Sequence, residues 1–106
     1  MIYRFRSKAS GDLIMLGPLG DRLLRAWGRE PSAKGIVEVA DMPQALAQLD
    51  AAIAAEAAEL ATARALALSE GKTPPTDTLS LRQRWWPMRE MLERCHGAAE
   101  VIVWGV

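Results

Sequence analysis

The sequence predicts an α+β fold in which a small mixed three-stranded sheet packs against about three helices. Three observations carry this prediction: strand-like patterns at both ends of the chain, an alanine-rich run after Asp41, and an apolar stripe of helical period after Ser80. The predicted strands span about residues 2–6, 36–39 and 101–104, and the predicted helices span about 18–27, 42–68 and 81–96. With 106 residues, we expect a single domain, 1–106, with a mobile loop at about 69–79.

The first predicted strand alternates in polarity. On an extended chain, Tyr3 and Phe5 point to one side, and the opposite side carries Ile2, Arg4 and Arg6. That period is typical of a strand with one buried face. The apolar run at 12–16 is too short for periodicity to decide between a further strand and a helical turn.

Pro18 and Gly28 delimit the first predicted helix. Proline is favoured at the first helical position and glycine just after the last one, and apolar residues recur between the two at helical spacing. Residues 36–39 follow a loop and form a short β-branched run, which fits the second strand.

The longest predicted element is the alanine-rich helix at 42–68. Asp41 stands where a helix cap belongs, Pro43 fits the first turn, and no glycine or proline follows before Gly71. About 27 helical residues would measure about 40 Å at 1.5 Å per residue, which is more than a domain of this size covers. Either the end of this helix projects, or another helix or subunit lies along it.

The helix at 81–96 has the clearest pattern. Ser80 and Gln83 form a capping-box pair at its start, and Gly97 predicts its end. Side chains at spacings of 3 and 4 share one helix face, and here they form an apolar stripe that predicts burial. The stripe consists of Leu81, Trp85, Met88, Leu92 and Cys95.

The order of the elements predicts the direction of the strands. One helix between the first two strands favours a parallel pair. The two-helix connection that follows would place the last strand antiparallel to the second, so the sheet should be mixed.

A second face of the 81–96 helix carries the candidate interaction residues Arg82, Trp86, Arg89 and His96. Large apolar residues are commonly buried, so Trp86 is explained either by packing in the core or against a second subunit, or by an exposed interaction face. Tryptophan and arginine are enriched at the energetic centres of interfaces. We expect this face, or the distal part of the alanine-rich helix, to contact a protein partner or a second copy of the chain.

Basic residues of the first strand form an alternative site. Arg4, Arg6 and Lys8 interleave with aromatic residues, a pattern that would suit nucleic acid, with cations on phosphates and rings on bases. Lysine and arginine are also common on solvent-facing strands, where they discourage edge pairing. The alternative function is a nucleic-acid or regulatory binding protein that uses these residues together with the basic residues of the helix at 81–96, and a small enzyme is a third class.

Composition excludes several classes of protein. The chain has 13 basic and 13 acidic residues, so no net charge attracts nucleic acid or anionic lipid. One cysteine excludes an internal disulfide, and one histidine excludes a multi-histidine metal site within a single chain. No catalytic, cofactor or metal motif is present, so we expect no cofactor. The N-terminus has no apolar run of signal-peptide length and no membrane-spanning run occurs, which predicts a cytoplasmic protein.

Five stretches, spread over nearly the whole chain, resemble a known family. They are FRSKASGDLIML, GREPSAKGI, DMPQALAQLDAAI, SLRQRWWPMREMLERCHGA and the terminal VIVWGV. In this order they are similar to small bacterial proteins, known chiefly from proteobacteria, that are catalogued as domain of unknown function 1840. The resemblance implies a compact cytoplasmic bacterial protein and transfers no activity and no catalytic residue.

Overall fold

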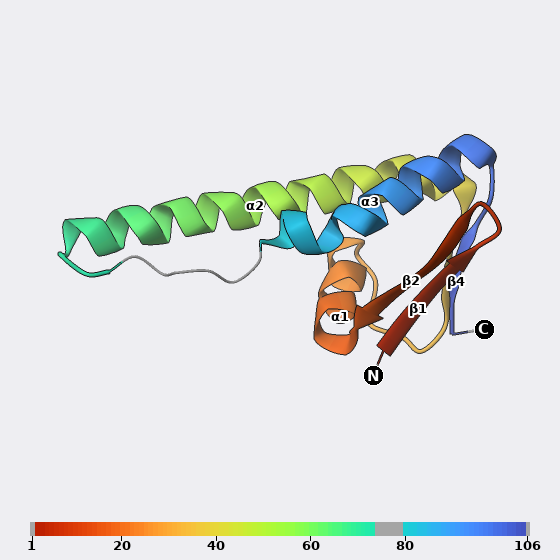
Figure 1. Ribbon diagram of the computed structural model, residues 1–106, viewed down its shortest axis with the longest axis horizontal. Coiled ribbons are helices and arrows are strands. Elements are labelled where there is room, and N and C mark those ends of the chain that lie inside the picture. The colour runs from red at the N-terminus through yellow and green to blue at the C-terminus, as the bar shows by residue number, and fades with distance from the viewer. Residues whose placement is uncertain (1, 74–79, 106) are drawn as a thin grey trace.

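The computed structural model describes residues 2–73 and 80–105. The described strands are β1 (Ile2–Ser7), β2 (Ser10–Leu16), β3 (Gly35–Val37) and β4 (Ile102–Trp104). The helices are α1 (Gly17–Ala26), α2 (Met42–Ser69) and α3 (Leu81–Ala98), with a 3₁₀ turn, η1 (Val39–Asp41), before α2. In Figure 1, α2 and α3 lie side by side as one layer, and the sheet and α1 lie beneath their shared end. The predicted α+β class is confirmed.

The sheet differs from the prediction in two ways. The described residues form four strands in the order β2-β1-β4-β3, and every neighbouring pair is antiparallel. The strand left undecided at 12–16 is β2, which forms a hairpin with β1 through the two residues Lys8 and Ala9. The predicted antiparallel pairing of the last strand with the 36–39 strand is confirmed. The predicted parallel pair is wrong because β4 lies between β1 and β3.

The hydrophobic core lies between the inner face of the sheet and the helices. Tyr3 and Phe5 are buried while Ile2, Arg4 and Arg6 are exposed, so the alternation predicted for the first strand is confirmed. The whole predicted stripe of α3 is buried as well. It packs with Leu23 and Leu24 of α1, Met42 and Leu49 of α2, and Ile102 and Trp104 of β4.

Two helix ends show where local signals succeed and fail. Helix α1 ends as predicted, because Gly28 adopts a left-handed φ of 73° and the Arg29 N–H donates back to the Leu24 carbonyl at 2.9 Å. Gly97 does not end α3. The helix runs on to Ala98, and Ala99 takes the left-handed position with φ 56°.

Helix α2 is the longest element and projects from the rest of the molecule. It has 28 residues, and the molecule measures 51 × 27 × 22 Å along its principal axes. Helix α3 runs antiparallel to α2 and covers its first half, whereas the second half extends past the start of α3 (Figure 1). The predicted loop at 69–79 begins after Ser69, and its residues 74–79 lie outside the described residues.

Candidate functional site

The site is built on the first turns of α3. The Gln83 N–H donates to the Ser80 hydroxyl at 3.2 Å, and the Ser80 N–H donates to the Gln83 side chain at 3.1 Å, which confirms the predicted capping box. This cap fixes where the helix begins and therefore which residues face the core. Because Leu81 and Trp85 point into the core, Arg82 and Trp86 point away from it.

Trp86 lies between two guanidinium groups. The Arg82 and Arg89 guanidinium carbons lie 5.4 Å and 5.3 Å from the Trp86 ring centroid, within the range of cation–π contacts. Trp86 is 40% exposed. The structure thus brings together three of the four predicted face residues and places an aromatic ring at the surface between two cations.

Arg89 connects α3 to α2. Its Nε and Nη2 donate to the two carboxylate oxygens of Asp50 at 2.9 Å and 3.2 Å, and its Nη1 donates to Glu93. The hydrogen bond to Asp50 is the main cause that raises the pKa of Arg89, and the charges of Asp50 and Glu93 add to it. Arg89 therefore stays a cation whose charge is already matched. Arg82 has no ion pair among the described residues.

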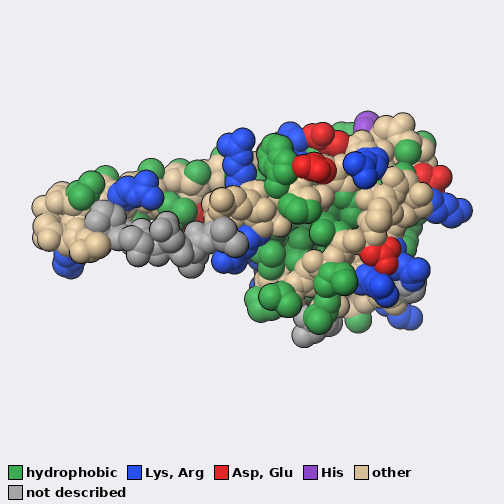
Figure 2. Space-filling view, in the orientation of Figure 1, with side chains coloured by type: hydrophobic (Ala, Val, Ile, Leu, Met, Phe, Trp, Pro, Cys, Tyr) green, Lys and Arg blue, Asp and Glu red, His purple; other side chains and the backbone are tan. Residues whose placement is uncertain are grey.

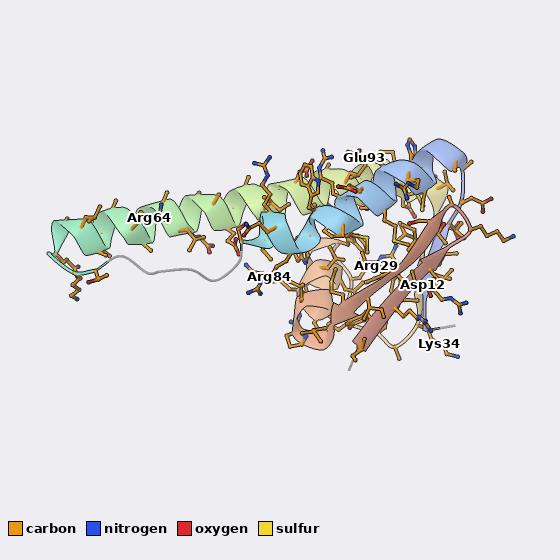
Figure 3. The ribbon with its side chains drawn as sticks, in the orientation of Figure 1. Asp12, Arg29, Lys34, Arg64, Arg84 and Glu93 are labelled. Atoms are coloured by element: carbon orange, nitrogen blue, oxygen red, sulfur yellow. The ribbon has the colours of Figure 1, made fainter. Side chains whose placement is uncertain are left out.

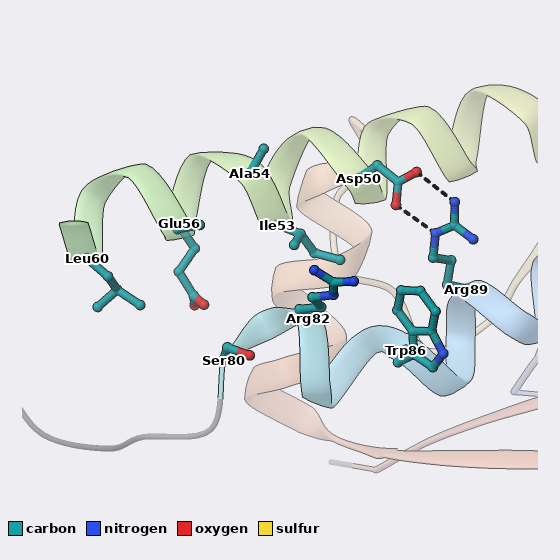
Figure 4. Close-up of a pocket in the computed structure, with 10 residues that line it drawn as sticks. Asp50, Ile53, Ala54, Glu56, Leu60, Ser80, Arg82, Trp86 and Arg89 are labelled. Atoms are coloured by element: carbon teal, nitrogen blue, oxygen red, sulfur yellow. Dashed lines mark hydrogen bonds and ion pairs between the residues drawn. The ribbon is translucent and has the colours of Figure 1, made fainter. Parts of the chain in front are cut away.

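A groove of about 610 Å³ lies between α2 and the start of α3. Its α3 side is formed by Ser80 and the Arg82–Trp86–Arg89 stack, and its α2 side is largely apolar (Figure 4). The α2 residues are Asp50, Ile53, Ala54, Glu56, Ala57 and Leu60. The volume falls in the range of sites that bind ligands or side chains of a partner.

Glu56 is a structural residue of this site that sequence reasoning missed. In the sequence it is one carboxylate within the alanine-rich run. In the structure its carboxylate accepts the Leu81 N–H at 2.7 Å and lies 3.7 Å from the Arg22 guanidinium of α1. One side chain of α2 therefore holds the start of α3 and the side of α1. No periodicity in the sequence signals such a contact, because its partners lie 25 and 34 positions away.

His96 and Cys95 lie outside the groove. His96 is exposed in the last turn of α3, and the groove lining does not include it. Cys95 is a free, fully buried thiol on the core stripe. The two side chains therefore point to different environments, as expected for neighbours on a helix, and form no catalytic pair.

The alternative basic patch lies on the outer face of the sheet. Arg4 and Arg6 approach the Asp12 carboxylate at 3.0 Å and 3.9 Å (Figure 3 labels Asp12). Arg6 and Lys8 line a separate hollow of about 340 Å³ together with Asp12 and Glu100. Carboxylates thus accompany the cations, and the rings of Tyr3 and Phe5, which would stack on bases, are buried on the opposite face.

The hydroxyl and the carboxylates that line the groove are engaged within the fold. The hydroxyl, Ser80, is engaged in the helix cap, and the carboxylates are engaged with Arg89 and with the start of α3. Within residues 2–73 and 80–105, no group of three or more His, Cys, Asp and Glu side chains could hold a metal ion. Among the described helices, none has the length and apolar character needed to cross a membrane.

Comparison with known proteins identifies a family and nothing further. A family model with the description "Domain of unknown function (DUF1840)" matches residues 1–104. No curated protein and no solved structure matches the chain. The groove must therefore be interpreted from its own geometry.

Proposed function

This chain belongs to the family described as Domain of unknown function (DUF1840), and because that description assigns no activity, we propose a function from the groove itself. The protein is a non-enzymatic protein-interaction module whose contact surface is the groove between α2 and α3, and the occupant of the groove is a polypeptide. The cytoplasmic location expected from the sequence remains part of this proposal.

The observation that carries the proposal is Trp86. A large ring that stays 40% exposed loses the free energy that burial would provide. The contacts with Arg82 and Arg89 hold the ring in one orientation, so binding would cost little further side-chain entropy. Tryptophan and arginine are among the residues enriched at binding hot spots, and here they lie together at the edge of an apolar groove.

The groove wall supports a polypeptide as the occupant. Ile53, Ala57 and Leu60 present an apolar strip on α2, while Arg82 presents the one groove cation without an ion pair among the described residues. The strip matches apolar side chains of an approaching helix, and the open shape admits a helix or extended segment along α2.

A binding experiment with a matched control tests the proposal. The tagged chain is used to capture polypeptides from a lysate of its native host at low and moderate salt, beside Trp86→Ala and Ile36→Ala variants. Ile36 is the control because it has nearly the same exposure, 38%, and lies on the sheet away from the groove. We expect a polypeptide to be retained at both salt concentrations. Its binding free energy should be weakened by about 2 kcal/mol or more in Trp86→Ala and should be unchanged in Ile36→Ala.

Two results would contradict the proposal. Retention of nucleic acid alone, removed by moderate salt, would favour the basic surface of Arg4, Arg6 and Lys8 instead. A captured polypeptide that Trp86→Ala and Ile36→Ala release equally, or not at all, would show that the groove is not the contact surface.

A further inference from the structure

We propose that the polypeptide that occupies the groove is a second copy of this chain. The projecting half of α2, defined here as residues 57–69, would lie antiparallel along α2 of the other copy, and its tip would enter the other copy's groove. This inference rests on the function proposed above and names the partner.

The first argument is the exposure of the projecting half within the described part of the chain. Of the residues of α2, all of which the structure describes, those counted as buried are Met42, Ala45 and Leu49, and all three lie in its first half. In the projecting half, Leu60 and Leu68, which share one side of the helix, are 41% and 63% exposed. Figure 2 shows hydrophobic side chains along this part of the molecule. An isolated helix of about 13 residues is marginal in water, so a surface that covers it would stabilise it.

The second argument is that the groove wall and the projecting half share one helix face. Residues at spacings of 3 and 4 along α2 lie on the same side. Beginning in the groove and continuing past the start of α3, that side carries Ile53, Ala57, Leu60, Arg64 and Leu68. Each copy therefore has, on one face of α2, both the apolar wall of the groove and the leucines Leu60 and Leu68, which could fill the groove of the other copy. A two-fold axis satisfies both surfaces at once and closes the assembly at two chains.

The third argument is the match of side-chain sizes in an antiparallel register. Suppose that Leu68 of one copy faces Ile53 of the other, next to Trp86. In a two-fold antiparallel pair, this contact fixes which residues face each other along the rest of the helix. Arg64 then faces Ala57, and Leu60 faces Ala61. A large side chain meets a small one at both of these levels, which allows the two helices to approach closely.

Charge supports the same register. Arg64 has no ion pair among the described residues, and Figure 3 shows it on the projecting half. Facing Ala57 of the other copy, it would lie next to that copy's Glu56, where it would add a second cation to a carboxylate that already accepts the Leu81 N–H and lies 3.7 Å from Arg22. A partner protein of different sequence would have to supply this complementarity independently.

The oligomeric state of the full chain tests the inference. Sedimentation analysis over a concentration series should show a monomer–dimer equilibrium. Leu68→Glu places a carboxylate against Ile53 and should raise the dimer dissociation constant at least ~10-fold. Leu66→Glu is the matched control, because Leu66 is similarly exposed but lies about 200° away around the helix; it should leave the constant unchanged. Circular dichroism verifies that both variants keep their helices.

A charge test at Ala57 checks the register. Ala57→Lys would face Arg64 of the other copy with a like charge and should weaken the dimer. Ala57→Glu would face Arg64 with an opposite charge and should retain it. Equal weakening of the dimer by Ala57→Lys and Ala57→Glu would overturn the proposed register. Equal effects of Leu66→Glu and Leu68→Glu on the dissociation constant would overturn the proposal that the face carrying Leu68 forms the contact.

The result also separates the two proposals. A chain that stays monomeric at every concentration, yet captures a different polypeptide in a Trp86-dependent manner, would overturn the self-association and leave the interaction module intact. A monomeric chain without Trp86-dependent capture would overturn both.

Discussion

Trp85 and Trp86 are neighbours in the sequence with opposite surroundings. Trp85 is fully buried in the core, whereas Trp86 is 40% exposed between two arginines. Helical spacing alone separates them, because Trp85 continues the stripe that includes Leu81 and Met88. The sequence therefore predicts which tryptophan is core. It left Trp86 open, since packing under another element and exposure in a groove fit the same pattern.

Tyr3 is the residue for which the structure predicts a pH dependence of stability. Its hydroxyl donates to the Asp21 carboxylate of α1. Burial, then this hydrogen bond and the charge of Asp21, raise the pKa of Tyr3 from 10.0 to about 12. The folded protein therefore holds the proton more tightly than the unfolded chain. The stability contributed by Tyr3 is fully present below pH about 10 and is lost as the pH rises to about 12.

Urea unfolding at pH 8 and pH 11 measures this contribution. Other groups also titrate in that interval, so the Tyr3→Phe variant provides the reference. We expect the free energy of unfolding of the native protein to fall more than that of Tyr3→Phe. Equal losses in the two proteins would show that the Tyr3 proton is not held more tightly after folding.

At the scale of elements, Glu56 links three helices. Its carboxylate accepts the first N–H of α3 and approaches Arg22 of α1. We expect Glu56→Ala to reduce the free energy of unfolding by about 1–2 kcal/mol, as for the loss of a helix cap. Glu59→Ala is the control: Glu59 is exposed one turn further along α2, and its loss should cost no more than about 0.5 kcal/mol. Urea unfolding of both variants checks the prediction, and similar costs would mean that the contact to Leu81 adds no stability.

The helices and three of the four described strands were predictable from the sequence to within one or two residues, whereas strand β2 and the order of the strands were not. Periodicity and the Ser80–Gln83 pair define α3 locally, so its start needed no tertiary information. Strand β2 resisted prediction because its hairpin turn at Lys8 and Ala9 contains no glycine, asparagine or proline. The end of α3 was predicted two residues early because alanine rarely adopts the left-handed conformation seen at Ala99.

At the scale of the whole molecule, helix α2 determines how elongated the protein is. The radius of gyration is 15.8 Å, whereas a compact chain of about this length has about 13 Å. The excess follows from the second half of α2, which extends past the compact end (Figure 1). The length of the alanine-rich run predicted that this helix outreaches the domain. The groove at its base could not be predicted, because it requires Asp50 and Arg89, from two elements, to be joined.

This shape gives the last prediction, on amide hydrogen exchange. In a monomer, none of residues 57–69 is among the buried residues of the described part of the chain, so their amides should exchange rapidly, whereas core amides such as that of Leu92 exchange slowly. If two copies pair along α2, raising the protein concentration should slow exchange in residues 57–69 and leave the core unchanged, because binding stabilises only what it covers. Leu68→Glu should abolish that concentration dependence and Leu66→Glu should preserve it. Exchange at 57–69 that is independent of concentration in the native chain would mean that the projecting half of α2 has no partner in a second copy.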